Sequence, residues 1–451
     1  MAFFDFVKNI FSSNNSKNDL DTPLFAPKFK ILIIEFSDNV EGNSGETITR
    51  MLRDKEGIEV HYFDEPFNKN FLNFDSKELF DWIDRGQTVI DRTGADVIVW
   101  GFREGNRLRL NFQSTNQYES NRKIFISLVD SLYIPAINLN DREKIATAVI
   151  NLIHGAIIST VESKDKELKI YRKYLLRKII DRLINDDSAK SLSIEFMPYI
   201  MNFLGIIYLS YAFENKDDKD FKIIKNLFET AIKHQDLISN PIHLGCIYYH
   251  LGQLYDCASS NIDKHPALFF KGAIEYYVQS QKYLSKHNYP YEYGSICYRL
   301  SSLYFSYWKQ KSDIQALRDA VFQLREAEKI YTYALFPEFW ANIQENLGHL
   351  LAILGNLTNS SEISALAIDS YKNKQKVVTE RKDPISWAIT QSEVGDIFYR
   401  LGKSSQNKEL LEDALEYFHD ALYIFENAKM DDEIKKLNVN ISKTSQYISV
   451  L

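Results

Sequence analysis

The sequence contains few cysteines, no long apolar run and no excess of basic residues, and each shortage excludes a class of protein. Three cysteines, Cys246, Cys257 and Cys297, are too few and odd in number for a disulfide framework, which favours a reducing compartment. No stretch of about 18 apolar residues occurs, so we expect no transmembrane helix. The net charge of −7 supplies no basic field, so we predict no nucleic-acid partner.

Signals for export and for catalysis are also missing. The first residues, MAFFDFVKNIFSSNNSKND, lack the basic start, the longer apolar core and the small-residue cleavage site of a secretory signal. No Ser-His-Asp, Cys-His-Asn or paired-carboxylate arrangement stands out, because acidic residues are spread along the chain. We therefore expect a cytoplasmic protein that is not an enzyme, with no catalytic residues and no cofactor.

Two short motifs have a chemical interpretation and a simpler structural one. The loop EGNSGET, residues 41–47, lacks the lysine and the second glycine at the spacing of a phosphate-binding P-loop. In HLGCIYYHLGQLYDC, His243, Cys246, His250 and Cys257 would lie on one helix face. At a rise of 1.5 Å per residue they span about 21 Å, too far for one tetrahedral zinc site. We interpret the motifs as a strand-to-helix loop and a packing helix, and we predict no metal site.

Internal repetition is the dominant feature of the sequence. The stretch DPISWAITQSEVGDIFYRLG has its proline, tryptophan, glutamine and glycines 47 residues after the same residue types in FPEFWANIQENLGHLLAILG. Further copies reach back through Leu251-Gly252 and Leu204-Gly205, which makes five in all. Each copy has two amphipathic stretches around a polar loop, and a proline opens the next copy. Because a lone helical hairpin cannot cover its apolar face, we predict that the copies stack into a solenoid.

Small residues recur in the second stretch of each copy. They are Ala273, Ala320, Ala367 and Ala414, followed at a second small position by Ser280, Ala327 and Ala421. Three positions depart from the pattern: Ser301 replaces the glycine, Lys374 replaces the second small residue, and Asn226 falls at the first alanine register in copy one. Small side chains let helices approach closely, so we expect this register to lie at helix contacts.

The pattern resembles the tetratricopeptide repeat (TPR), whose first helix carries an aromatic residue, Leu-Gly and Tyr, and whose second carries Ala, an aromatic residue and Ala. The matching residues in the last copy are Trp387, Val394-Gly395, Phe398, Ala414, Phe418 and Ala421. The resemblance covers about residues 196–430 and is closest to the lengthened bacterial variety, because the period is 47 where the basic repeat has about 34. It implies a solenoid that binds a protein or peptide partner in its concave groove.

The resemblance also suggests partner-binding residues, which would be outward polar side chains of the first helices. These are Gln344, Asn346, Gln391, Ser392 and Arg400. A competing interpretation is that Gln344 and Gln391 only tie neighbouring hairpins together. The expected function is a protein–protein interaction scaffold, and the alternative is a regulatory protein that senses a ligand or peptide through the solenoid.

Before the repeats, the order of patterns is that of a small α/β domain. The apolar run FKILIIEF predicts a buried strand, and further strands are expected at 58–63, in ADVIVWGFR, in GNRLRLNFQ and near 123–129. Helices are expected at about 45–54, in SKELFDWIDRGQTVIDRTG and at about 141–160. This order, with ILIIEFSDN early and TGADVIVWGFREGNRLRLNFQS late, resembles the N-terminal domain of TolB. The resemblance implies a domain that mediates contacts without catalytic residues.

Two further segments have amphipathic patterns. KDKELKIYRKYLLRKIIDRL predicts a linker helix with an apolar stripe of Ile170, Leu175, Leu176, Ile179 and Ile180. Its basic face could meet an acidic partner or anionic lipid, or could simply be solvated. MAFFDFVKNIF predicts an amphipathic helix that docks on a membrane or on protein through Phe3, Phe4, Phe6, Val7, Ile10 and Phe11. The polar stretch after it predicts a flexible tether.

Together these patterns predict an α+β N-terminal domain with a small mixed sheet, followed by an all-α TPR-like solenoid. The predicted boundaries are 1–28 for the amphipathic helix and tether, 29–160 for the α/β domain, 161–195 for the linker helix, 196–430 for about five hairpins and 431–451 for a capping helix. The expected location is the cytoplasm or the cytoplasmic face of a membrane. The sequence leaves open whether the chain forms a homo-oligomer.

Overall fold

The computed structural model describes residues 27–38, 44–64, 76–114, 129–136, 143–161, 165–185, 192–212, 218–261 and 266–451. These residues form two compact units that divide between Tyr293 and Gly294. We call the part up to Tyr293 unit 1 and the part from Gly294 to Leu451 unit 2. The predicted N-terminal amphipathic helix lies outside the described residues.

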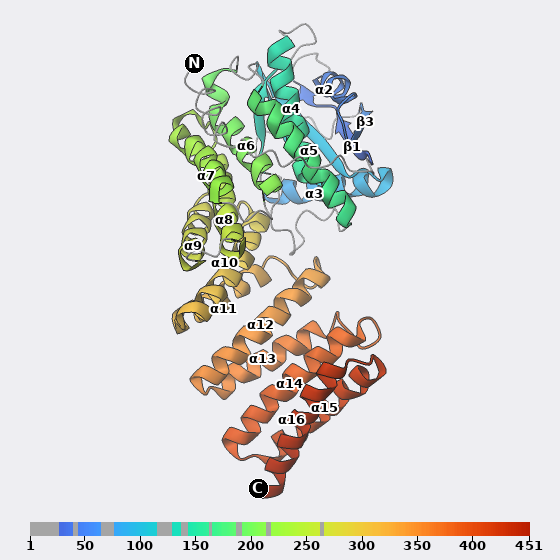
Figure 1. Cartoon of the computed structure of the whole chain (residues 1–451), viewed down its shortest axis with the longest axis vertical. Coiled ribbons are helices and arrows are strands. Elements are labelled where there is room, and N and C mark those ends of the chain that lie inside the picture. The colour runs from blue at the N-terminus through green and yellow to red at the C-terminus, as the bar shows by residue number, and fades with distance from the viewer. Residues whose placement is uncertain are drawn as a thin grey trace. The chain divides into compact units, whose positions relative to one another are not determined.

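Unit 1 begins with a mixed sheet (Figure 1). Its strands are β1 (Phe29–Ile34), β2 (Ser37–Asp38), β3 (Ile58–Phe63), β4 (Val97–Glu104), β5 (Arg107–Ser114) and β6 (Leu132–Pro135). The order is β3-β1-β4-β5-β6, with β2 paired to the end of β4. β1 runs parallel to β3 and β4, whereas β5 is antiparallel to both β4 and β6. The last strand therefore lies later than the strand expected near 123–129, most of which falls outside the described residues.

Four helices accompany this sheet. They are α2 (Ser44–Leu52), α3 (Ser76–Thr93), α4 (Glu143–Thr160) and α5 (Lys166–Asn185). The β1 side chains Ile31 and Ile33 belong to the large core that includes α2, α4 and α5, whereas Leu32 and Ile34 pack in a second core with Ile90 of α3. Both faces of β1 are thus buried, which explains its unbroken apolar run.

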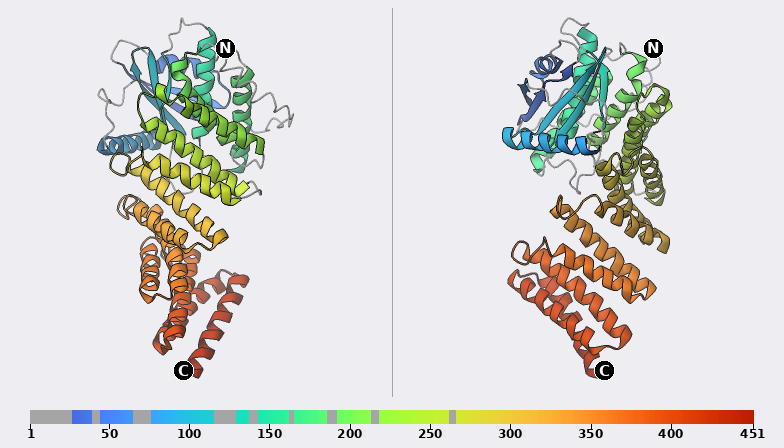
Figure 2. Two further views of the ribbon diagram at one scale, coloured as in Figure 1. Left: turned by 90° about the vertical axis from the view of Figure 1, so that its left-hand side faces the viewer. Right: turned by 180° about the vertical axis from the view of Figure 1, so that it is seen from behind.

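The described helices after the sheet form five hairpins and a final helix (Figures 1 and 2). The hairpins are α6 (Met197–Ala212) with α7 (Asp218–Lys233), α8 (Ile242–Asn261) with α9 (Pro266–Gln281), α10 (Pro290–Lys311) with α11 (Ile314–Glu328), α12 (Pro337–Thr358) with α13 (Ser361–Lys374), and α14 (Pro384–Ser405) with α15 (Lys408–Asn427); α16 (Asp431–Val450) follows. The predicted fold class, an α+β domain followed by an all-α region, is confirmed.

A glycine of each first helix lies against a ring of the second helix in four of the five hairpins. The pairs are Gly205 with Phe228, Gly252 with Tyr277, Gly348 with Tyr371, and Gly395 with Phe418. A Cβ atom at Gly395 would lie only 2.7 Å from ring carbons of Phe418, so no larger residue fits without movement. In the third hairpin the same register holds Ser301 and Leu324, both buried, which suggests that a smaller partner compensates for the larger residue.

This contact corrects the register of copy one. Four residues before the ring, the later copies have a buried alanine, but copy one has Ile224, not Asn226. Counting back by 47 missed two extra residues between Gly252 and Tyr277, in the connection from α8 to α9. Three residues after the ring, Ala231 is fully buried, so copy one keeps the second small position.

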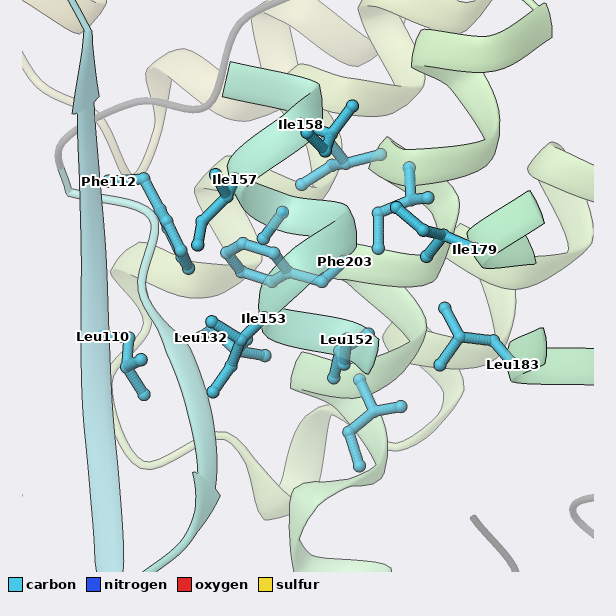
Figure 3. Packing of buried hydrophobic residues seen from close by; sticks show 14 of the residues in the cluster. Leu110, Phe112, Leu132, Leu152, Ile153, Ile157, Ile158, Ile179, Leu183 and Phe203 are labelled. Carbon is cyan, nitrogen blue, oxygen red and sulfur yellow. The ribbon is translucent and has the colours of Figure 1, made fainter. Parts of the chain in front are cut away.

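Helix α5 is part of the unit 1 core rather than a linker. Leu175, Leu176, Ile179 and Ile180 are buried as expected, but Ile170 is 51% exposed because the buried stripe passes through Tyr171 instead. Figure 3 shows side chains of strands β5 and β6 and of helices α4, α5 and α6 meeting in this core. The α/β part and the first two hairpins therefore form one compact unit, and the division falls at 293/294 instead of within 161–195.

Candidate interaction face

The first helices of the first two hairpins bind the α/β part of unit 1 through a buried carboxylate. Asp130, which precedes β6, is 1% exposed. Its two oxygens accept hydrogen bonds from Nδ2 of Asn202 on α6 at 3.2 and 3.1 Å, and His250 Nε2 on α8 lies 2.7 Å from Oδ2. Since a buried charge without partners is costly, these bonds fix the position of both helices on the sheet.

Aromatic rings extend the same contact. Tyr133 of β6 packs against Tyr199 of α6, with ring centroids 4.6 Å apart, and edge to face against His243 of α8 at 5.1 Å. Phe112 of β5 lies 5.9 Å from Phe203 of α6 (Figure 3). Arg109 and Asn111 of β5 both donate to the hydroxyl of Ser131 at 2.9 Å. The first-helix side chains thus bind a folded protein surface within this chain.

The carboxylate–imidazole pair does not have the composition of a nucleophilic triad. The second ring nitrogen of His250, Nδ1, lies 2.8 Å from Gln253 Oε1, where a triad would have a hydroxyl or thiol. His250 is also fully buried. We conclude that this arrangement holds helices together.

The possible zinc ligands of α8 have separate environments. His243 contacts the rings of Tyr133 and Tyr199, and burial lowers its pKa to about 3. His250 contacts Asp130, and Cys246 and Cys257 are buried thiols, the pKa of Cys246 being raised by burial. Among the described residues, no group of three or more ligand-type side chains could hold a metal ion.

The docking residues of unit 1 have register equivalents in unit 2. Position is counted from the glycine of each first helix, which fixes the register. Three residues before the glycine, Asn202 of unit 1 corresponds to Glu345 and Ser392 of unit 2. Two residues before the glycine, Phe203 and His250 correspond to Asn346 and Glu393. One residue after the glycine, Gln253 corresponds to His349 and Asp396. We call the unit 2 surface made by Tyr298, Phe305, Glu345, Asn346, His349, Ser392, Asp396 and Arg400 the first-helix face.

Contacts between neighbouring first helices organise this face. Asn346 of α12 donates to the hydroxyl of Tyr298 on α10 at 3.1 Å, and the rings of Phe305 and His349 meet edge to face at 5.6 Å. Asn346 and His349 are exposed. Asn346 and His349 are therefore held by neighbouring first helices while their outer surfaces stay accessible.

Two carboxylates on α14 have perturbed acidity. Burial and the neighbouring Glu393 raise the pKa of Asp396 to about 6, although Arg400 opposes the shift. The pKa of Glu393 is also raised by burial, against the charge of Arg400 and a hydrogen bond from Tyr371. Asn440 of α16 donates to Asp396 Oδ1 at 3.0 Å. Burial thus favours the protonated form of both carboxyl groups, and the charge of Arg400 offsets part of this effect.

The five predicted partner-binding residues fall into two groups. Asn346 is exposed, and Ser392 and Arg400 are half-buried on the first-helix face. Gln344 is buried and donates to Glu328 of α11 at 2.6 Å; Gln391, also buried, accepts from Gln375 at 2.9 Å and donates to Asp420 of α15 at 3.1 Å. The geometry of Gln344 and Gln391 favours the competing interpretation, in which they tie hairpins together.

The other motifs of unit 1 also make internal contacts. Arg172 of α5 donates to the carbonyl oxygens of Ile158 and Ser159 at the end of α4, both at 2.9 Å. Lys178 binds Glu56 at 2.9 Å. At the described end of the EGNSGET loop, the backbone N–H of Gly45 donates to the carboxylate of Glu35 at 3.0 Å. A carboxylate of the chain itself therefore lies where a phosphate-binding loop would hold its ligand.

Comparisons with known proteins add little to this geometry. No protein-family model and no curated protein matches the chain. Among solved structures, the chain is similar to the crystal structure of BtubC (BKLC) from P. vanneervenii, with 17% identity and a TM-score of 0.35 over 56% of this chain and 91% of that chain. In the part of the chain that the structure describes, no helix is long and apolar enough to cross a membrane.

Proposed function

We propose that this chain is a non-enzymatic protein–protein interaction scaffold of the TPR type, which binds a protein or peptide partner on the first-helix face of unit 2. One observation carries the proposal: the equivalent positions of unit 1 already bind a folded surface. Asn202, Phe203 and His250 contact the α/β part, and their counterparts Ser392, Asn346 and Glu393 lie at the same register of later hairpins.

The side chains of the first-helix face favour a partner segment that carries both polar and apolar side chains. Tyr298 and Phe305 supply aromatic surface, Asn346 and Ser392 supply hydrogen-bonding groups, and Asp396 supplies a carboxylate. Next to Ser392, Ile389 is 41% exposed on α14. Aromatic anchors with adaptable polar neighbours are typical of protein-binding surfaces.

Site-specific photo-crosslinking tests the proposal. A photoreactive amino acid is placed at Asn346 or Ser392 of the full chain, and at Ser361 or Asn427, which are exposed on the second helices α13 and α15. In extracts of the cells that carry this protein, we expect discrete crosslinked partners from the first pair of positions only. Equal crosslinking from both pairs would contradict the assignment of the face.

Binding measurements then follow with the partner that is captured. Asn346→Arg with Ser392→Arg should weaken binding by at least about tenfold, because two large charged side chains would occupy the contact surface. Ser361→Arg with Asn427→Arg introduces the same charges on second helices and should leave the affinity unchanged. A partner that binds both double variants equally well does not use the first-helix face.

Attachment through the N-terminal segment is a separate part of the proposal. Phe3, Phe4, Phe6, Val7, Ile10 and Phe11 lie outside the described residues, so the membrane and the protein-docking interpretations both stay open. We expect the full chain to co-sediment with liposomes and Phe3→Asp with Phe6→Asp to stay in the supernatant. If the two proteins partition equally, the N-terminal segment does not bind the membrane, and docking on protein is the remaining interpretation of its amphipathic pattern. A location at the cytoplasmic face of a membrane would then have no support.

A further inference from the structure

Among the strands that the structure describes, β3 forms one edge of the sheet (Figure 1), and only its β1 side has a described neighbour. The register shows which backbone groups bond to β1: Phe29 N–H donates to Gly57 O and Glu35 N–H donates to Phe63 O. In a parallel pair only alternate residues of β3 bond to β1, so the backbone groups of Ile58, Val60 and Tyr62 point outward. An edge of this kind can pair with another strand.

The side chains of β3 form a pattern that is complementary to itself. Glu59 and His61 are both exposed on the same face of the strand, and His61 Nε2 lies 3.0 Å from Glu59 Oε1. In an antiparallel pair of two copies centred on Val60, Glu59 of each copy lies opposite His61 of the other. Tyr62, which is 36% exposed, would lie opposite Ile58.

The position of the outward groups fits this pairing and no register shifted by one residue. Centring the pair on Val60 brings Ile58, Val60 and Tyr62 of both copies into hydrogen-bonded positions, because these residues carry the outward N–H and C=O groups. Glu59 and His61 then fall at the non-hydrogen-bonded positions, where opposing side chains are closest. Backbone geometry and the pairing of a carboxylate with an imidazole thus select the same arrangement.

We propose that β3 pairs antiparallel with β3 of a second copy of this chain, centred on Val60, which joins two sheets into one. The interface consists of one strand pair and is therefore small, so the dimer forms at micromolar or higher concentration. This surface lies on the α/β part of unit 1, and it is independent of the first-helix face.

Sedimentation velocity of the full chain over a range of concentrations tests the pairing. We expect a monomer–dimer equilibrium that Val60→Pro abolishes, because proline removes the outward N–H at the centre of the pair. The N–H of Val60 does not bond to β1, so the variant should keep its fold, which circular dichroism and the melting temperature report. A chain that stays monomeric at every concentration, or a dimer that tolerates Val60→Pro, overturns the proposal.

A charge swap distinguishes self-pairing from any other contact. His61→Glu should weaken the dimer by about tenfold, because two symmetric like-charge pairs replace two Glu–His pairs. Adding Glu59→His to His61→Glu again places Glu opposite His and should restore the affinity. If the double variant stays as weak as His61→Glu, the two copies do not pair in this register.

Discussion

The same register of the repeat has opposite environments in the two units. In unit 1, His250 is fully buried against Asp130 of the α/β part, whereas in unit 2 its counterpart Asn346 is exposed and its counterpart Glu393 is half-buried. The hairpin core is alike in both, because Gly252 contacts Tyr277 as Gly395 contacts Phe418. The common glycine–ring contact sets the packing within these hairpins, while the outward positions of the first helices differ in residue type and in environment.

Removing the carboxylate of Asp130 should give the largest effect on this comparison. Asp130→Ala leaves His250 and Asn202 buried without their acceptor, so we expect unit 1 to lose about 3–5 kcal/mol of unfolding free energy. Urea unfolding followed by circular dichroism measures the loss. The matched control is Asp396→Ala on the first-helix face of unit 2, where the carboxylate is only half-buried. Similar losses in the two variants would show that the carboxylate of unit 1 has no special docking role.

Placing the Ser301 and Leu324 residue types of the third hairpin at Gly395 and Phe418 of the fifth tests whether the two positions compensate for each other. Gly395→Ser places a side chain against Phe418 and should cost about 1–3 kcal/mol. Phe418→Leu alone should also destabilise unit 2, because it leaves a cavity. The double variant reproduces the Ser301 and Leu324 combination, so its loss should be smaller than the sum by at least about 0.5 kcal/mol. Strictly additive losses would contradict the compensation between these positions.

Gln391 and Ser392 are adjacent, but we expect them to act differently. Gln391→Met keeps the side-chain length and removes the bonds to Gln375 and Asp420, so it should cost about 1–2 kcal/mol of stability. It should leave partner binding unchanged at temperatures where the variant is folded. Ser392→Ala should have the reverse effect, with stability within about 0.5 kcal/mol of the original chain and weaker binding. Thermal unfolding combined with titration of the captured partner compares the two.

The sequence predicted the hairpins because their signals are local. Prolines at 290, 337 and 384 begin first helices, and the glycine and alanine registers lie at buried helix contacts. Long-range pairing was not predictable in this way. Asp130 contacts His250 across 120 positions, and no local pattern connects a residue before a strand to a helix of the second hairpin.

Errors in register came from the same limitation. Asn226 was assigned to the alanine register because counting back by 47 from Ala273 made no allowance for the two extra residues between Gly252 and Tyr277. Gln344 and Gln391 were recognised as polar residues of first helices, but their burial depends on Glu328, Asn373 and Asp420 of neighbouring second helices. Counting forward from the glycine of each copy, instead of back by the period, would have placed Ile224 at the alanine register of copy one.

The smallest expected effect concerns the acidity of Asp396. Its pKa in the folded chain is about 6, above its ordinary value near 4, so the folded state binds a proton more tightly than the unfolded state between these pH values. By linkage, the stability of unit 2 falls as the pH rises through this window. We expect a fall of about 1 kcal/mol, because the side chain is half-buried and partly screened by solvent. Asp396→Asn keeps an oxygen for Asn440 and cannot ionise, so urea unfolding at pH 4.5 and pH 7 should show a smaller fall for this variant. If the variant and the original chain show the same pH dependence, the raised pKa of Asp396 does not contribute to stability, and a different titrating group causes the change with pH.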